Sequence, residues 1–279
     1  MGFYKIDGKK YEVKKDYINL YECGLNLIRD IIGLDQLVNL RALLLERNNI
    51  SDIEGLENLI NLKILNLEDN HINEIKGLEK LTNLETLKLN INSISKIEQI
   101  ENLTNLIELN LSSNNIKIIE GLTKLIKLEK LSLANNQISK ISGLNSLKNL
   151  SLLTLDSNKI TKIENLPISK KLESLSLGDN KITEISGLDN YRNLILLYLR
   201  NNKISEITGL KSQNNLEYLD LSNNNIKELK GLERMTKLTQ LEFGGNLIDP
   251  NLIEKLGGLD RSGCALQPQK FVEYCRKNK

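Results

Sequence analysis

Apolar and polar residues alternate along this chain in a pattern that repeats every 22 residues. One copy, residues 62–83, reads LKILNLEDNHINEIKGLEKLTN. Asparagine recurs at positions 26, 48, 70, 92, 114, 136, 158, 180, 202, 224 and 246, and isoleucine follows two residues after each of them. Eleven copies with one period predict a solenoid, because a single copy cannot bury its apolar side chains without neighbours on both sides.

Each copy contains one short segment with the alternation of a β-strand. Side chains of a strand point alternately to opposite faces, so Leu65 and Leu67 are predicted to face the core. Ile64, Asn66 and Glu68 are then predicted to face outward. Stacked copies should therefore form one parallel sheet with a buried and an exposed face.

The turn after each strand carries the repeated asparagine. Its amide can bond backbone groups that a turn leaves unpaired, so we expect the asparagines to form a ladder through the solenoid. Glycine follows in eight copies, whereas Gln99 and Asn165 take its place in two others. This preference predicts a backbone conformation that a Cβ atom disfavours. The rest of each copy is too short for a long helix, and we expect 3₁₀ turns or irregular structure there.

Both ends of the array depart from the pattern. Residues 3–13 predict a β-hairpin with Asp7-Gly8 as its turn and Tyr4 opposite Tyr11, which could cap the first coil. The first copy is predicted to stay in register, with Ile18, Tyr21 and Cys23 in the core and Leu20 outside.

At the other end, Asp249-Pro250 predicts the start of a helix, and a second helix is expected after Pro268. We therefore divide the chain into an N-terminal cap at 1–17, eleven repeats at 18–249 and a C-terminal helical cap with a basic tail at 250–279. Pro167 and Ser169 interrupt the copy that starts at 150, which predicts a local distortion, with an insertion site or hinge as the alternative.

Composition restricts the functions that this solenoid can have. The net charge is +2, which favours neither nucleic acid nor a membrane as partner, although the lysines of 117–171 leave a nucleic-acid role as a minor alternative. We expect a monomer. The start of the chain lacks a secretory apolar segment and there are three cysteines, so we expect reduced thiols and a cytoplasmic protein. With one histidine, His71, and no phosphate-binding glycine loop, we expect no enzymatic activity, cofactor or metal.

The pattern L-x-x-L-x-L-x-x-N-x-I resembles the leucine-rich repeat family over residues 18–249. The resemblance implies an α/β solenoid: a right-handed horseshoe with a parallel β-sheet on its concave side and short 3₁₀ or irregular segments on its convex side. Repeats of 22 residues resemble those of the regulatory subunits of type-one protein phosphatase and those of the bacterial internalins. The resemblance implies an intracellular protein-binding scaffold or regulatory subunit, with a secreted or surface adhesin of internalin type as the alternative.

The predicted contact residues lie on the exposed face of the sheet, where we expect another protein to bind. Two spots are enriched in apolar, aromatic and charged side chains, and aromatic residues and arginine often dominate binding energies. The alternative is that these side chains only pack on one another. The candidate residues are Leu44, Ile64, Glu46, Glu68, Leu152, Leu196, Tyr198, Arg200, Tyr218 and Asp220.

Overall fold

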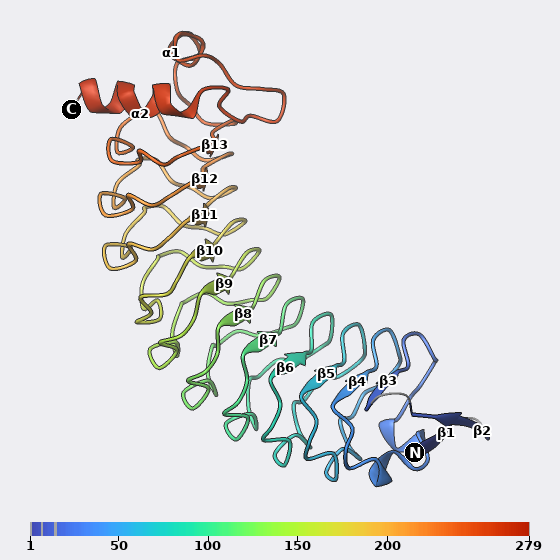
Figure 1. Cartoon of the computed structure of the whole chain (residues 1–279). Coiled ribbons are helices and arrows are strands. Elements are labelled where there is room, and N and C mark those ends of the chain that lie inside the picture. Colours follow the sequence, from blue (N-terminus) through green and yellow to red (C-terminus); the bar gives the residue numbers. More distant parts are fainter. Residues whose placement is uncertain (1, 7, 14–15, 279) are drawn as a thin grey trace. The chain divides into compact units, whose positions relative to one another are not determined.

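The structure, a computed structural model, describes residues 2–6, 8–13 and 16–278. The chain divides into two compact units. In each of them, short strands lie side by side along successive coils (Figure 1). The N-terminal unit comprises residues 1–137 with 143–147, and the C-terminal unit comprises residues 138–142 with 148–279.

Each predicted copy contributes one three-residue strand. In the N-terminal unit these are β3 (Tyr17–Asn19), β4 (Ala42–Leu44), β5 (Ile64–Asn66), β6 (Thr86–Lys88), β7 (Glu108–Asn110) and β8 (Lys130–Ser132). In the C-terminal unit they are β9 (Leu152–Thr154), β10 (Ser174–Ser176), β11 (Leu196–Tyr198), β12 (Tyr218–Asp220) and β13 (Gln240–Glu242). Within each unit consecutive strands pair in parallel, in the order of the chain. The predicted leucine-rich solenoid is therefore confirmed.

The buried face of the sheet is the one that the alternation predicted. Leu65 and Leu67 have no exposed surface, whereas Ile64 is 40% exposed. The isoleucines and leucines that follow each strand, such as Ile72 and Leu78, close the coil around the same core. Outside the strands, the described part of the solenoid has only two short 3₁₀ helices, η1 (Ile28–Asp30) and η2 (Leu34–Gln36), and otherwise turns.

The asparagine ladder forms from Asn48 onward and joins neighbouring coils. Asn202 is representative: its Oδ1 accepts a hydrogen bond from the Ile182 amide at 2.9 Å. Its Nδ2 donates to the carbonyl oxygens of Leu177 at 2.9 Å and Leu199 at 3.1 Å. Each ladder asparagine thus bonds backbone groups of two coils, and without Asn202 the Ile182 amide would be buried without this acceptor.

The repeated glycine has the backbone conformation that its recurrence predicted. Gly77 has a φ of +81°, and a Cβ atom there would lie 2.2 Å from the carbonyl oxygen of Ile53 in the preceding coil. Gln99 and Asn165, which replace the glycine, also have positive φ values of 60° and 52°. The position therefore requires a left-handed conformation, for which glycine carries no steric penalty.

The predicted register of the first copy is wrong by three residues. Ile18 pairs with Leu43 in the sheet, and Leu20 is buried at 5% exposure, whereas Cys23 and Asn26 are exposed. Ile18 and Leu20 alternate as well as Tyr21 and Cys23 do, and they place two aliphatic side chains in the core in place of a small thiol and a ring with a polar hydroxyl. Asn26 therefore does not belong to the ladder, and Leu20 does not belong to the exposed face.

The N-terminal hairpin consists of β1 (Phe3–Ile6) and β2 (Lys9–Glu12) in the predicted register, with Tyr4 opposite Tyr11. Asp7 of its predicted turn lies outside the described residues. Tyr4 and Ile6 are buried, which is expected of a cap over the first coil. The backbone of the hairpin pairs with Ile32, because Lys5 and Ile32 exchange two hydrogen bonds of 2.9 Å.

The C-terminal end is closed by helices and by a strand-like segment. Asp249 caps α1 (Pro250–Lys255) through its bond to the Asn251 amide at 2.9 Å, as predicted. The core side of α2 (Pro268–Lys277) carries the predicted Phe271, Val272 and Cys275, and Phe271 packs edge-on against Phe243. Residues 263–265 form backbone hydrogen bonds with β13 and the residues after it, which covers the edge of the sheet.

Three consecutive repeats of the C-terminal unit carry a polar residue where Leu81 stands in the copy at 62–83. Each side chain donates a hydrogen bond to a carbonyl oxygen of the preceding repeat: Ser169 to Leu150 at 2.7 Å, Tyr191 to Pro167 at 3.0 Å, and Gln213 to Leu188 at 2.5 Å. Polar replacements of a core leucine are thus accommodated by bonds to backbone. The predicted irregularity near Pro167 is local, since β9 and β10 pair on either side of it.

Candidate functional site

The exposed side of the parallel sheet in the C-terminal unit, here called the C-terminal sheet face, carries most of the predicted contact residues. Every strand presents its first and third residues, and the second residue after the strand continues the same alternation. The rows so formed are Leu152, Ser174, Leu196, Tyr218, Gln240; Thr154, Ser176, Tyr198, Asp220, Glu242; and Asp156, Gly178, Arg200, Ser222, Gly244. Short strands joined by the asparagine ladder hold these residues in fixed register.

Two tyrosines from neighbouring strands lie against each other on this face. The ring centroids of Tyr198 on β11 and Tyr218 on β12 are 4.7 Å apart, and their planes are inclined by 37°. Both side chains are half-buried. The register places Tyr198 opposite Asp220 and Leu196 opposite Tyr218, so the two rings meet diagonally across the strand pair.

The surroundings of Tyr218 hold its hydroxyl in the neutral form. Burial raises the pKa of Tyr218 above its ordinary value, and the nearby carboxylates of Asp220 and Glu242 raise the pKa further. The tyrosine pair therefore offers aromatic surface together with the neutral hydroxyl of Tyr218.

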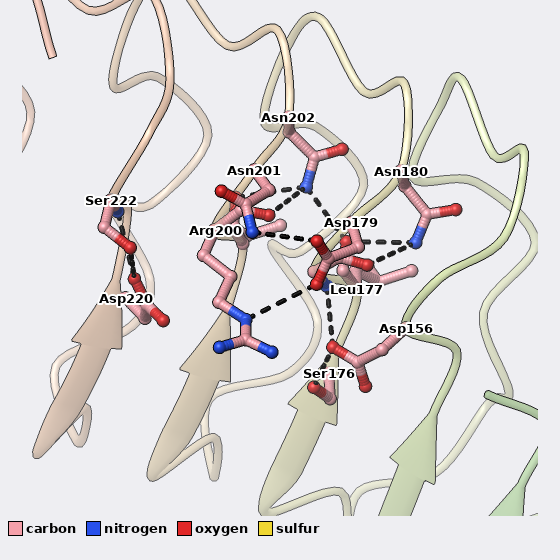
Figure 2. A network of polar contacts seen from close by, with 12 residues as sticks. Asp156, Ser176, Leu177, Asp179, Asn180, Arg200, Asn201, Asn202, Asp220 and Ser222 are labelled. Atoms are coloured by element: carbon pink, nitrogen blue, oxygen red, sulfur yellow. Dashed lines mark hydrogen bonds and ion pairs between the residues drawn. The ribbon is translucent and has the colours of Figure 1, made fainter. Parts of the chain in front are cut away.

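Beside the tyrosines lies a polar network centred on Asp156, which Figure 2 shows. The Asp156 carboxylate accepts hydrogen bonds from the Ser176 hydroxyl at 2.6 Å and the Gly178 amide at 2.9 Å. Burial raises the pKa of Asp156, and these hydrogen bonds together with Arg200 oppose the rise. A Cβ atom on Gly178 would lie 2.8 Å from an Asp156 oxygen and 3.1 Å from Cγ of Arg200, so glycine leaves room for both side chains.

Arg200 is exposed, and its guanidinium group forms an ion pair. Its Nε lies 3.5 Å from a carboxylate oxygen of Asp179, to whose other oxygen the Asn201 amide donates at 2.8 Å (Figure 2). Asp179 therefore compensates the guanidinium charge and fixes its direction along the edge of the strands.

Asp220 was predicted as a contact residue, and the structure buries its side chain. Its side chain is only 5% exposed, and its carboxylate accepts hydrogen bonds from the amide and the hydroxyl of Ser222 at 3.0 and 2.6 Å. After Asp220 the chain turns, and the turn places Ser222 against the Asp220 carboxylate. This carboxylate is therefore covered and does not offer a direct contact to a partner protein. Its charge still acts on the neighbouring Tyr218. Leu152, Leu196 and Tyr198 are partly accessible, and their contact with a partner stays a prediction.

The corresponding face of the N-terminal unit is smaller than predicted. Leu44 is half-buried and Ile64 is exposed, but Leu20 is lost to the core, so that Tyr17 stands opposite Ala42 instead. Tyr17 is 42% exposed and was missed, although the alternation of Ile18 and Leu20 could have placed it outside.

Predicted acidic residues border this N-terminal patch. An oxygen of the half-buried Glu46 accepts from the Asn66 amide at 2.5 Å, and the other oxygen is buried with no hydrogen-bond partner among the described residues. Glu68 is also half-buried, and its amide donates to Asn66 at 3.1 Å. Glu46 is thus engaged within the sheet, which reduces its capacity to contact a partner.

Among residues 2–6, 8–13 and 16–278, no three histidine, cysteine or acidic side chains gather as metal ligands would. In the same part of the chain no helix is long and apolar enough to cross a membrane. The three cysteines are free thiols. Cys23 was predicted to be buried in the core, but it is exposed.

These repeats define the class of protein. The model of the family described as "Leucine Rich repeats (2 copies)" matches residues 104–142, 126–168, 170–212 and 214–261. The chain belongs to the leucine-rich repeat family, whose members are typically non-catalytic and bind proteins.

Solved structures show which leucine-rich repeat proteins this chain is similar to. Internalin InlF of Listeria monocytogenes is 30% identical with a TM-score of 0.70, and the match covers 87% of this chain and 77% of that one. Internalin C2 of the same species is 31% identical with a TM-score of 0.55, over 72% of this chain and 78% of that one. The Leptospira interrogans leucine-rich repeat protein LIC12759 is 30% identical with a TM-score of 0.75, over 80% of this chain and 59% of that one. No curated protein matches the sequence.

The comparisons therefore support one part of the predicted resemblance. The chain is similar to internalins in fold and in its repeats of about 22 residues. The resemblance to phosphatase regulatory subunits and the cytoplasmic location stay predictions.

Proposed function

We propose that this chain is a non-catalytic binding module that holds a partner protein on the C-terminal sheet face. The observation that carries the proposal is the pair formed by Tyr198 and Tyr218, two half-buried rings 4.7 Å apart on a surface outside the core. The chain has eight tyrosines, three phenylalanines and no tryptophan, so an aromatic pair on the sheet is not a by-product of an aromatic-rich composition. Tyrosine is enriched among residues that dominate binding energies.

The surroundings of the pair support the same proposal. Leu196 and Leu152 extend the apolar surface along the first row of the face, while Ser174 and Ser176 between them are small. Partly exposed apolar side chains beside small polar ones form a shallow surface on which bulky partner side chains can rest. The asparagine ladder fixes the strands beneath, so little order has to be gained on binding.

The internalins provide the better supported context. Two internalin structures are 30–31% identical to this chain, and each is covered over more than three quarters of its length. We therefore favour an adhesin-like role over the phosphatase-regulator role, and fractionation of the native cells would separate the adhesin from a cytoplasmic scaffold.

The test is affinity capture with the purified chain as bait, followed by quantitative mass spectrometry. Tyr198→Ala combined with Tyr218→Ala should lower recovery of the specific partner at least about tenfold, because hot-spot truncations cost roughly 2 kcal/mol or more. The thermal midpoint should stay nearly unchanged, since both rings lie outside the core.

The matched control is Tyr17→Ala combined with Tyr21→Ala, which removes two exposed tyrosines from the N-terminal unit. Partner recovery should be retained in this control. Capture that survives the Tyr198 and Tyr218 exchange, or that depends on the control tyrosines instead, refutes the proposed site.

A further inference from the structure

Charge is segregated in the C-terminal unit. Its residues, 138–142 and 148–279, include 21 lysines and arginines against 16 aspartates and glutamates, so the unit as a whole is basic. Its sheet face has the opposite balance, with Asp156, Asp220 and Glu242 against the single base Arg200. Among the residues of this unit that the structure describes, every lysine and arginine other than Arg200 lies outside these three rows.

The one base on the face is already compensated. Arg200 lies against Asp179, and the Asn201 amide holds that carboxylate from its other oxygen. Gly178 leaves space for the arginine stem on one side and for Asp156 on the other. An approaching ligand therefore meets an acidic surface, not a mixture of free charges of both signs.

The acidic groups surround the aromatic pair. Asp220 stands opposite Tyr198 across the β11–β12 pair, and Glu242 stands opposite Asp220 on β13. The amide and the hydroxyl of Ser222 donate hydrogen bonds to Asp220 and orient its carboxylate. On the outer strand, the Gln240 amide donates to Glu242 at 3.0 Å and orients that carboxylate.

An aromatic face next to carboxylates attracts a cation in two ways. The negative face of a tyrosine ring attracts an ammonium or guanidinium group within about 6 Å of its centroid. A carboxylate in partly buried surroundings adds a Coulomb attraction that water screens less than it would on an open surface. The stem of a lysine or arginine is apolar, and Leu196 offers apolar surface beside the rings.

We propose that the C-terminal sheet face binds a basic segment of its partner protein, with a lysine or arginine side chain over Tyr198 and Tyr218 and beside Asp220 and Glu242. This inference rests on the proposed function and specifies the chemistry of the partner. A nucleic acid or an acidic peptide would meet carboxylates of like charge. The N-terminal sheet face lacks this combination, because Lys88 and Lys130 alternate there with Glu68 and Glu108.

The probe is the peptide acetyl-Gly-Lys-Leu-Lys-Gly-Lys-amide, titrated into the ¹⁵N-labelled full chain at low salt, with the same peptide carrying glutamate for lysine as the comparison. The lysine peptide should shift amide signals of β11, β12 and β13, and its affinity should fall at least about fivefold between roughly 0.03 and 0.5 M salt as the Debye length shrinks. The glutamate peptide should leave these signals in place.

Variants that keep shape but remove charge test the proposal further. Asp220→Asn combined with Glu242→Gln keeps the acceptor oxygens and should weaken the lysine peptide about fivefold or more. The matched control, Glu68→Gln combined with Glu108→Gln, removes two half-buried charges from the sheet face of the N-terminal unit and should change the affinity less than about twofold, because neither residue belongs to the C-terminal sheet face.

Each outcome has a defined meaning. Equal binding of the two peptides, shifts confined to other residues, or equal weakening by both double variants would overturn the basic-segment proposal. A captured partner that is lost with the tyrosine pair but is indifferent to salt and to Asp220→Asn with Glu242→Gln would also overturn it, while the proposed function would stand. Lysine-peptide binding at this face, together with protein capture that ignores the tyrosines, would support the cation site and refute the proposed function.

Discussion

Replacing Asn202 by alanine should destabilise the solenoid far more than the loss of one polar side chain from a surface. Asn202 is 8% exposed and bonds backbone groups of two coils. The Ile182 amide has the Asn202 Oδ1 as its hydrogen-bond acceptor, so alanine leaves this N–H buried without that partner.

The carbonyl oxygens that Asn202 contacts are affected less. Leu177 still accepts from Asn180 at 3.1 Å, and Leu199 still accepts from Asn224 at 3.0 Å. The expected cost is therefore one buried unsatisfied donor, about 1–3 kcal/mol, plus roughly 1 kcal/mol for the weakened carbonyl bonds. We expect a loss of about 2–4 kcal/mol in the free energy of unfolding.

The matched control is Asn193→Ala. The Asn193 amide also bonds a carbonyl oxygen of the preceding repeat, that of Lys170 at 2.6 Å, but this asparagine is exposed, so water can replace the bond. We expect about 0.5–1 kcal/mol for this variant.

Urea unfolding followed by circular dichroism gives the two free energies, and hydrogen exchange of the Ile182 amide reports the local effect. The local measurement matters because coils of a solenoid interact mainly with their neighbours and can open separately. Equal costs for Asn202→Ala and Asn193→Ala, or unchanged protection of the Ile182 amide, would refute the view that the ladder stabilises the coils by satisfying buried backbone groups.

Two further predictions concern the core. Gln213→Leu should stabilise the chain by about 1 kcal/mol, because the Gln213 Oε1 is buried without a hydrogen-bond partner among the described residues. The Leu188 carbonyl loses its bond from Gln213 but keeps the bond from the Tyr191 amide. A lower urea midpoint for this variant would contradict the prediction. Burial raises the pKa of Cys275 from 9.0 to about 11, so the folded state favours the protonated thiol and its stabilising contribution is lost as the pH rises from about 9 to about 11. The unfolding free energy should fall less over this range in Cys275→Ala than in the wild type, whereas Cys23→Ala, which alters an exposed thiol, should follow the wild type; an equal fall in all three would contradict the assignment.

The fold was predictable because a single pattern governs most of the chain. Leu65 and Leu67 lie on the one face of the strand that neighbouring coils can cover, and their fixed spacing to Asn70 sets the position of the turn. The recurring glycine indicated a left-handed backbone at a position where Gln99 and Asn165 also adopt it. In each case the same residue pattern recurs in several copies, so each copy supports the same local prediction.

The register of the first copy could not be obtained from the period. Asn26 and Ile28 continue the 22-residue spacing, but no earlier repeat constrains the strand that precedes them. The alternation of Ile18 and Leu20 competes with that of Tyr21 and Cys23, and burial of the bulkier aliphatic pair prevails. The strand register at the end of the array is thus determined by packing, whereas the register in its interior follows from the 22-residue period.

The site shows a different limit. Alternation correctly assigned Tyr198, Tyr218 and Asp220 to the outward face, but it gave no measure of how far each side chain reaches into solvent. Asp220 is covered because Ser222 bonds back to it, a contact that depends on the path of the chain after the strand. The sequence therefore predicts which side chains belong to the face, whereas the structure distinguishes those that can touch a partner from those that act on it through their charge.

This distinction explains how a uniform scaffold can carry a specific site. The core, the ladder and the glycine turns use the same residue types in nearly every coil, whereas the outward strand positions vary from coil to coil. On the C-terminal sheet face this freedom places two tyrosines on adjacent strands and carboxylates beside them, while the bases of the unit are kept elsewhere, with Arg200 bound to Asp179. Because neighbouring strands lie about 4.8 Å apart, a few substitutions at these positions are enough to bring groups of chosen chemistry into contact without altering the coil that holds them.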